Sequence, residues 1–198
     1  MMMMTKIIFI LTILIAYSCG QNEVITYEQA LQNHKTAQEK KQLANPGQFV
    51  YVGYDSFIGA RMPDSIGKLI SGESVDQQFI ANKITLFNFW FEGCPPCLGE
   101  IPELNEIVRK FGKEKFNFVA VGRETDQNAI AVIANHNWQF NPLANGDVII
   151  EKKFRHRWGY PTTMVVNQHG IIVSMWSAIY EDNVDAFVHH LDSLRNQL

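Results

Sequence analysis

The amino-acid sequence predicts an α/β domain, in which helices cover both faces of a central mixed β-sheet. Two short apolar runs, 84–91 and 116–122, have the composition of strands that are buried on both faces. A segment with helical periodicity follows each run, and a strand hairpin and an amphipathic helix end the chain. This order of elements favours a sheet with both parallel and antiparallel pairs.

The chain has 198 residues, of which 46% are hydrophobic and 19% are charged. This length suits one domain with appendages, since a domain averages about 150 residues, and the composition provides enough apolar surface for a core. The formal net charge of -3 creates no field that would attract a polyanion. We therefore expect no nucleic-acid partner.

Residues 1–18 have the features of a secretory signal peptide. Lys6 precedes an apolar run, 7–16, that is shorter than the roughly 20 residues needed to cross a bilayer. Cys19 follows directly, and the segment resembles a bacterial lipoprotein signal, which implies cleavage before Cys19 and acylation of its thiol. An ordinary signal peptide is the alternative, and both predict export. We expect a membrane-anchored lipoprotein of a bacterial cell envelope that faces the periplasm.

Residues 19–48 are polar and are expected to form a lipid-anchored tether, with a helix between Tyr27 and Leu43. The folded domain is expected to cover residues 49–198. It begins with an alternating segment, 49–54, that is typical of a strand. A stretch rich in Gly and Ser, 59–74, is expected to be loop and turn.

The centre of the predicted domain is a strand, a helix and a second strand. The apolar run 84–91 is expected to be the central buried strand. The apolar residues of 95–111 recur at helical spacing, with a kink at Pro102 and an end at Gly112. The run 116–122 is expected to be a second buried strand.

The remaining elements follow the same patterns. A helix is expected at 126–135, a connection at 138–143 and a short basic helix at 151–158. The apolar face of the first of these helices is expected to contain Ala129, Ile130 and Ile133.

The chain is expected to end in a hairpin and a helix. The segments 163–167 and 171–176 are separated by Gln-His-Gly and read as antiparallel strands. The helix 182–198 is expected to face the core with Val184, Phe187, Val188, Leu191 and Leu194.

Two cysteines separated by two prolines lie between the central strand and its helix. A helix N-terminus favours a thiolate, so Cys94 is the candidate nucleophile. Cys97 lies one turn later and can resolve a mixed disulfide formed on Cys94. Prolines 95 and 96 suit the first turn of a helix, where a missing N–H costs nothing. The spacing predicts a redox-active pair.

Other roles for the pair fit the sequence less well. A structural zinc site would need a second pair of ligands, and haem attachment would need His where Leu98 stands. A structural disulfide stays open. We expect no metal and no cofactor other than the redox-active disulfide Cys94–Cys97.

Five motifs together resemble the TlpA/ResA-like branch of the thioredoxin superfamily, and the resemblance covers residues 58–198. The motifs are Asn-Phe-Trp at 88–90, Cys-Pro-Pro-Cys at 94–97, Glu-Ile-Pro-Glu-Leu at 100–104, Gly-Tyr-Pro-Thr-Thr at 159–163 and Asn-Gln-His-Gly-Ile-Ile at 167–172. The resemblance implies a thioredoxin-like fold and a membrane-tethered, extracytoplasmic thiol-disulfide oxidoreductase. Its implied partners are protein disulfide substrates and a membrane thiol electron donor.

The resemblance also implies a substrate-binding turn beside the cysteine pair. Pro161 is expected to be cis, with an ordinary trans proline as the alternative. Tyr160 and Pro161 are expected to contact the substrate together with Pro95.

Glu100 follows Cys97 by three residues and shares its helix face. In ResA-like proteins the matching glutamate is thought to tune the cysteine pair and manage its protons. A solvated carboxylate at a helix start is the alternative. Asn88 stands where thioredoxins carry a buried acid, and Gly93 replaces the usual tryptophan before the first cysteine. Because the buried acid that relays protons in thioredoxins is absent, a proton-transfer role for Glu100 is favoured.

Two further groups are weaker candidates. The basic run 155–157 could place charge at the rim of the active site, although a solvated helix face is the simpler expectation. His189 and His190 have no partner at ligand spacing and are expected to be structural.

Three functions stay open at this point. A protein-disulfide reductase fits best, and its substrates could be apocytochrome c thiols, as in cytochrome c biogenesis, or wrongly formed disulfides; oxidative folding is the opposite direction. A peroxiredoxin-like peroxidase would carry Thr where Phe91 stands. A surface binding module with an inert disulfide is the third alternative.

Overall fold

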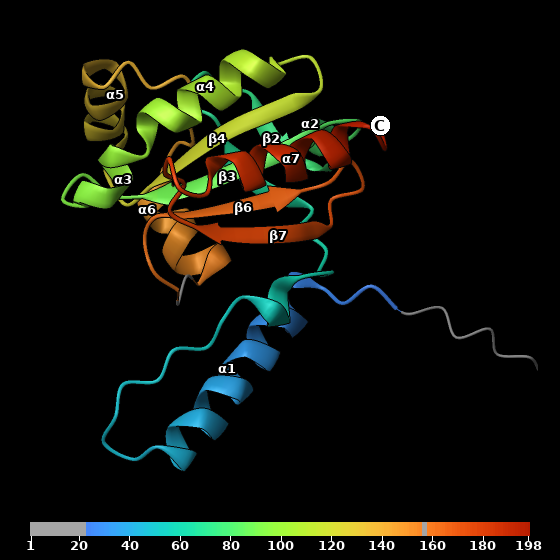
Figure 1. Ribbon diagram of the computed structural model, residues 1–198, viewed down its shortest axis with the longest axis vertical. Helices are drawn as coiled ribbons and strands as arrows, with labels where there is room; N and C mark the ends of the chain where they lie inside the picture. The colour runs from blue at the N-terminus through green and yellow to red at the C-terminus, as the bar shows by residue number, and fades with distance from the viewer. Residues whose placement is uncertain (1–22, 156–157) are drawn as a thin grey trace, which may run out of the picture.

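The computed structural model describes residues 23–155 and 158–198 (Figure 1). The predicted signal peptide, Cys19, His156 and Arg157 lie outside the described residues. Among the described helices, none combines the length and the apolar character that a membrane crossing requires.

The centre of the molecule is a five-stranded mixed sheet, as predicted. Its strand order is β5-β4-β3-β6-β7. The parallel pair of β3 (Ile84–Trp90) and β4 (Phe116–Gly122) confirms the two predicted central strands. The predicted hairpin is formed by β6 (Thr162–Val166) and β7 (Ile172–Ser177), and β6 pairs antiparallel with β3.

A strand of two residues, β5 (Asn141–Pro142), completes the sheet within the segment expected to be a connection. All residues of β3, β4 and β6 are buried. This burial explains why apolar residues in these strands run continuously instead of alternating with polar ones.

Helices cover both faces of the sheet and form two hydrophobic clusters. One cluster joins the sheet to α3 (Pro95–Gly99), α4 (Ile101–Phe111), α5 (Asp126–Asn135) and α7 (Val184–Arg195). The other lies on the opposite face, because successive side chains of a strand point to opposite faces: Leu86 belongs to the first cluster and Phe87 to the second.

The helix predicted over 95–111 is two helices that meet at Glu100. Pro102 lies in the first turn of α4, where its ring and missing N–H prevent a continuous helix. The expected kink is therefore a complete break. Gly112 ends α4 as predicted and adopts a positive φ of 68°.

Two expectations for the segment before β3 are wrong. Residues 49–54 form no strand, and the side chain of Phe49 is 93% exposed. The stretch expected to be loop contains β1 (Ser65–Lys68), which pairs with β2 (Ser74–Asp76) in a separate sheet. Ile66 and Val75 of this hairpin are fully buried, so these short strands depend on apolar contacts that a Gly- and Ser-rich sequence does not indicate. A short helix, α2 (Gln77–Ile80), leads into β3.

Two helices differ in detail from their predictions. In α5 the buried residues are Ala129 and Val132, whereas Ile130 is half exposed, so the predicted face is rotated. The helical segment expected over 151–158 begins earlier, as α6 (Gly146–Ile149), and continues as the π-helix η2 (Ile150–Phe154). The buried side chains Ile149, Ile150 and Phe154 define its inner face. In α7, Phe187, Leu191 and Leu194 are buried as predicted.

The predicted helix of the tether is α1 (Tyr27–Ala44). Its first turns are packed against the domain, where Tyr27, Ala30 and His34 are buried. Tyr27 contacts Phe57 of η1 (Asp55–Phe57) and donates a hydrogen bond to the carbonyl of Phe154 at 3.1 Å. The start of the expected tether is therefore part of the second hydrophobic cluster.

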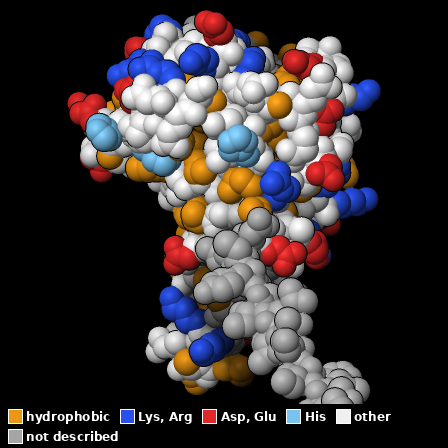
Figure 2. Space-filling model, turned by 90° about the vertical axis from the view of Figure 1, so that its right-hand side faces the viewer, with side chains coloured by type: hydrophobic (Ala, Val, Ile, Leu, Met, Phe, Trp, Pro, Cys, Tyr) orange, Lys and Arg blue, Asp and Glu red, His pale blue; other side chains and the backbone are white. Residues whose placement is uncertain are grey.

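The rest of α1 extends away from the sheet (Figure 1). In the side view of Figure 2 it forms a narrow projection below the body of the domain, with basic side chains exposed on it. An ion pair between Arg155 and Glu28 joins its first turn to the end of η2.

Removing the N-cap of α1 should destabilise the protein. The Thr26 hydroxyl accepts from the Gln29 N–H, and the Gln29 side chain accepts from the Thr26 N–H. Thr26→Ala is expected to lower the free energy of unfolding by about 1 kcal/mol, measured by urea denaturation. Thr36→Ala, at an exposed position of the same helix, is the control and should not destabilise. Equal effects of the two variants would contradict a specific role for the cap.

Candidate redox site

The two cysteines form a disulfide at the start of α3, at the end of the central strand. Cys94 is the N-cap residue and Cys97 lies in the first turn, with their Cα atoms 5.3 Å apart. The Cys97 N–H donates to Cys94 Sγ at 3.2 Å. When the pair is reduced, this N–H is a donor for a thiolate on Cys94. Both side chains are at least 97% buried, so a large substrate must approach along the surface above them.

The exposed part of this site is the proline pair. Pro95 and Pro96 are both exposed and occupy the first turn of α3, as predicted. The Tyr180 hydroxyl, which comes from the segment after β7, donates to the Pro96 carbonyl at 3.0 Å. This contact connects the cysteine turn to the far end of the chain.

The peptide bond between Tyr160 and Pro161 is cis, as the sequence motifs implied. The Tyr160 ring meets the Phe91 ring edge to face at 5.3 Å between centroids, and Phe91 precedes Cys94 by three residues. The Thr162 hydroxyl, directly after the turn, donates to the Gly159 carbonyl at 2.8 Å. The turn and the disulfide therefore lie at the same edge of the sheet.

Glu100 is completely buried at the junction of α3 and α4. One carboxylate oxygen, Oε1, accepts from Asn88 Nδ2 at 2.7 Å, and Oε2 accepts from the Ile179 N–H at 2.6 Å. The pKa of this carboxyl is raised to about 7, because burial and, to a smaller extent, the charge of Glu103 raise it more than the two hydrogen bonds lower it. The carboxyl can therefore gain or lose a proton near neutral pH, which a solvated first-turn glutamate could not do.

Asn88 and Thr163 complete the buried polar group behind the cysteines. They are cross-strand partners on β3 and β6, and Asn88 Nδ2 also donates to Thr163 Oγ1 at 3.0 Å. From the sequence, Asn88 is part of a family motif and the position of an absent acid, and no partner is predicted for it. An amide in the middle of a largely apolar central strand is the signal that could have identified it as a partner of a buried group.

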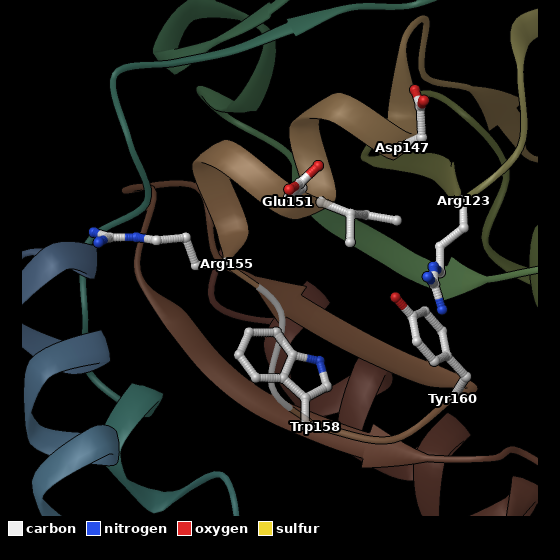
Figure 3. A pocket seen from close by; sticks show the side chains of 7 residues that line it. Arg123, Asp147, Glu151, Arg155, Trp158 and Tyr160 are labelled. Atoms are coloured by element: carbon white, nitrogen blue, oxygen red, sulfur yellow. The ribbon is translucent and has the colours of Figure 1, made fainter.

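A cleft of about 640 Å³ opens beside the cis-proline turn (Figure 3). Tyr160 and Arg123 form one wall, with the Arg123 guanidinium 5.8 Å from the centre of the Tyr160 ring. Asp147 of α6 and Glu151 of η2 project from the helical segment (Figure 3). The lining residues are Arg123, Asp147, Ile150, Glu151, Arg155, Trp158 and Tyr160. The cleft thus offers aromatic surface and both signs of charge next to the redox site.

Arg155 and His190, which the sequence marked as weaker candidates, have contacts away from the cysteine pair. Arg155 lines this cleft and also pairs with Glu28, so its charge is shared between the cleft and α1. His190 has a structural contact, since its Nε2 lies 2.8 Å from Ser174 Oγ. Within residues 23–155 and 158–198, no group of three potential ligands could hold a metal ion.

The sequence matches the AhpC/TSA family over residues 58–175. Among proteins of similar sequence are the thiol-disulfide oxidoreductase ResA of Halalkalibacterium halodurans and the thioredoxin-like protein YneN of Bacillus subtilis. The first is 24% identical over 125 residues, which are 60% of this chain and 68% of ResA. The second is 27% identical over 122 residues, which are 58% of this chain and 68% of YneN.

Solved structures show the same fold. A protein described as a thiol:disulfide interchange protein, DsbE, of Chlorobium tepidum superimposes with a TM-score of 0.60 and 18% identity, covering 68% of this chain and 95% of that protein. StoA of Bacillus subtilis gives a TM-score of 0.50 and 20% identity, covering 62% of this chain and 92% of StoA. The family match extends over more than half of the chain and includes the cysteine pair and the cis-proline. The chain therefore belongs to the AhpC/TSA family and is a TlpA/ResA-like protein of the thioredoxin superfamily.

Proposed function

We propose that this protein is an extracytoplasmic thiol-disulfide oxidoreductase that reduces disulfides in other proteins through Cys94 and Cys97. The observation that carries the proposal is a cysteine pair at a helix start with a buried, titratable carboxyl three residues later. The relatives named as thiol-disulfide oxidoreductases support the same chemistry.

The reaction begins with the reduced pair. The Cys94 thiolate attacks one sulfur of the substrate disulfide, and the departing substrate thiolate takes a proton from solvent. Cys97 then loses its proton to the Glu100 carboxylate and attacks Cys94 Sγ. The second substrate sulfur leaves as a thiolate and takes the proton that Glu100 holds, and the pair ends as the disulfide. The substrate gains two electrons from the two cysteines. It also gains two protons, one from Cys97 by way of Glu100 and one from solvent, which had received the proton of Cys94 when its thiolate formed.

A dithiol must then reduce the Cys94–Cys97 disulfide before the next cycle. A membrane protein that donates thiol electrons suits a protein held at the membrane by Cys19. The predicted signal segment supports this location. Because the first turns of α1 pack against the domain, the residues between Cys19 and Tyr27 would connect the anchor to the redox domain. Acylation of Cys19 would be tested by mass spectrometry of the N-terminal peptide from membranes.

The exposed surface around the disulfide suits an extended polypeptide. In the proposed complex, the segment around the substrate cysteine lies over Pro95 and Pro161, and its continuation enters the cleft beside Tyr160. A peptide, with its many polar groups, matches the mixed lining of this cleft better than a small apolar molecule does.

Replacing Tyr160 should weaken substrate binding without damaging the cysteine chemistry. Tyr160→Ala is expected to lower kcat/KM for a disulfide-bonded protein about tenfold, since aromatic anchors dominate such contacts. The rate at which dithiothreitol reduces Cys94–Cys97 should change little. Phe49→Ala, which removes an aromatic side chain at a 93% exposed position, is the control. An equal loss with dithiothreitol would mean that Tyr160 supports the disulfide itself rather than the substrate.

The direction of electron flow is decided by the redox state of Cys94 and Cys97 in intact cells, measured by thiol trapping. A mostly reduced pair supports the reductase, and a mostly oxidised pair contradicts it in favour of oxidative folding. Consumption of hydrogen peroxide by the reduced protein would instead support a peroxidase. A reduction potential well below about -300 mV would support a structural disulfide.

A further inference from the structure

Three buried polar side chains from three different elements meet where α3, the helix of the cysteine pair, gives way to α4. Asn88 is on β3, Thr163 is on β6 and Glu100 lies between α3 and α4. Each is at least 99% buried. Asn88 is the central member, because its Nδ2 donates to both of the others.

This arrangement satisfies the charged form of Glu100. A carboxylate can only accept hydrogen bonds, and both of its oxygens do so here, from Asn88 Nδ2 and from the Ile179 N–H. The Asn88 oxygen, Oδ1, is buried and has no hydrogen-bond partner among the described residues. A buried oxygen without a partner costs free energy and needs an explanation.

The neutral form of Glu100 needs a hydrogen-bond acceptor for its hydroxyl. The Ile179 N–H that faces one oxygen is itself a donor and cannot accept this hydrogen bond. Asn88 can accept this hydroxyl only if its amide rotates by half a turn, so that Oδ1 takes the place of Nδ2. The Thr163 hydroxyl fits either orientation, since it can accept from Nδ2 or donate to Oδ1.

We propose that Asn88 is a positioning residue of the redox reaction, and that its amide rotates when Glu100 takes up or releases the proton exchanged with the cysteines. This inference rests on the proposed function of the pair. In the charged state Nδ2 faces Glu100, and in the neutral state Oδ1 does. The rotated amide leaves its two N–H groups without a described partner, so Asn88 favours the carboxylate and opposes the effect of burial.

Other charged or titratable groups also act on Glu100 or lie near it in the chain. Glu103 on α4 disfavours the carboxylate, and the charge of Glu100 raises the pKa of Tyr180, which follows β7. The two thiols of the reduced pair lie in α3 and at its start, three and six residues before Glu100. None of these groups can replace Asn88, because among the described residues only Asn88 and the Ile179 N–H donate hydrogen bonds to the carboxyl oxygens of Glu100.

The test is a pH titration of the protein by isotope-edited NMR, following the Glu100 carboxyl and the Asn88 side-chain amide. In the unmodified protein both signals should change with one common midpoint. In Asn88→Leu the Glu100 midpoint should rise by about one pH unit or more, since a hydrogen bond to the charged form is lost. The same shift should appear in the pH profile of thiol-disulfide exchange.

Asn117→Leu is the matched control. Asn117 is also a buried amide on a central strand, and its Nδ2 donates to Thr85 Oγ1 at 3.1 Å, but it does not contact Glu100. It should leave the Glu100 midpoint unchanged. An unchanged midpoint in Asn88→Leu, or an equal shift in Asn117→Leu, would overturn the proposal.

Two features keep the test decisive. If Asn88→Leu does not fold, the unmodified protein still tests the proposal. An Asn88 side-chain amide signal that does not change over the pH range in which Glu100 titrates would refute the rotation. The titration also needs no substrate. Loss of the proposed oxidoreductase activity is therefore separable from failure of the role of Asn88.

Discussion

Cys97→Ala is expected to accumulate mixed disulfides between Cys94 and substrate proteins, with turnover lowered by about a thousandfold or more. The reason is that Cys94 can still attack, but residues 23–155 and 158–198 then hold no second thiol that could displace the substrate. The adducts would be measured by non-reducing electrophoresis and by mass spectrometry of the cross-linked peptides.

The double variant Cys94→Ala with Cys97→Ala is the control and should trap nothing. Cys94→Ala alone should also lose turnover, and any adducts on Cys97 should be few, because Cys97 lies inside the first turn of α3, whereas Cys94 is its N-cap residue. Adducts that form mainly through Cys97 would reverse the assignment of the nucleophile. Normal turnover in either single variant would contradict the two-cysteine mechanism.

Glu100→Gln is expected to change the pH dependence of both stability and activity. Burial raises the pKa of Glu100 from 4.5 to about 7 in the folded protein. The folded state therefore binds this proton more tightly than the unfolded state does, and the stabilisation is complete below pH 4.5. It is lost as the pH rises from about 4.5 to 7, and the loss is roughly 3 kcal/mol.

The amide side chain that Glu100→Gln introduces does not titrate, so this part of the pH dependence should disappear from the variant. The measurement is the free energy of unfolding by urea at about pH 4 and about pH 8. Glu114→Gln, at an exposed position, is the control and should retain the slope of the unmodified protein. An identical slope in Glu100→Gln would show that the carboxyl does not titrate in this range.

The activity of the same variant should fall because Cys97 loses its proton acceptor. General-base catalysis of this kind contributes about a hundredfold. In the unmodified protein the exchange rate should rise through pH 7, where Glu100 becomes charged, and the variant should lack this inflection. An unchanged pH profile would assign the proton to solvent.

The central part of the fold could be predicted from the sequence because its patterns are local. A continuous apolar run predicts a strand buried on both faces, as in β3 and β4. The hairpin of β6 and β7 follows from its turn residues. The cysteine pair lies where a strand passes into a helix, so its place in the fold was predictable as well.

The predictions of secondary structure and burial were wrong where contacts with distant segments override the local sequence pattern. Residues 49–54 alternate like a strand but pair with no strand in the described part of the chain. The hairpin of β1 and β2 has few strand-forming residues and is held by the burial of Ile66 and Val75. In α1 a polar composition concealed three buried side chains. Each outcome depends on segments that are distant in sequence.

The candidate site divides in the same way. The chemistry could be predicted from residue identity and spacing, since Cys94, Cys97 and Glu100 place a carboxyl three residues after a dithiol. The protonation of that carboxyl depends on contacts that the sequence does not reveal. Asn88 from a neighbouring strand and the Ile179 N–H from the far end of the chain meet it in a site closed to water. The pKa of a buried group depends on the partners and the solvent around it, and packing rather than residue order brings these together.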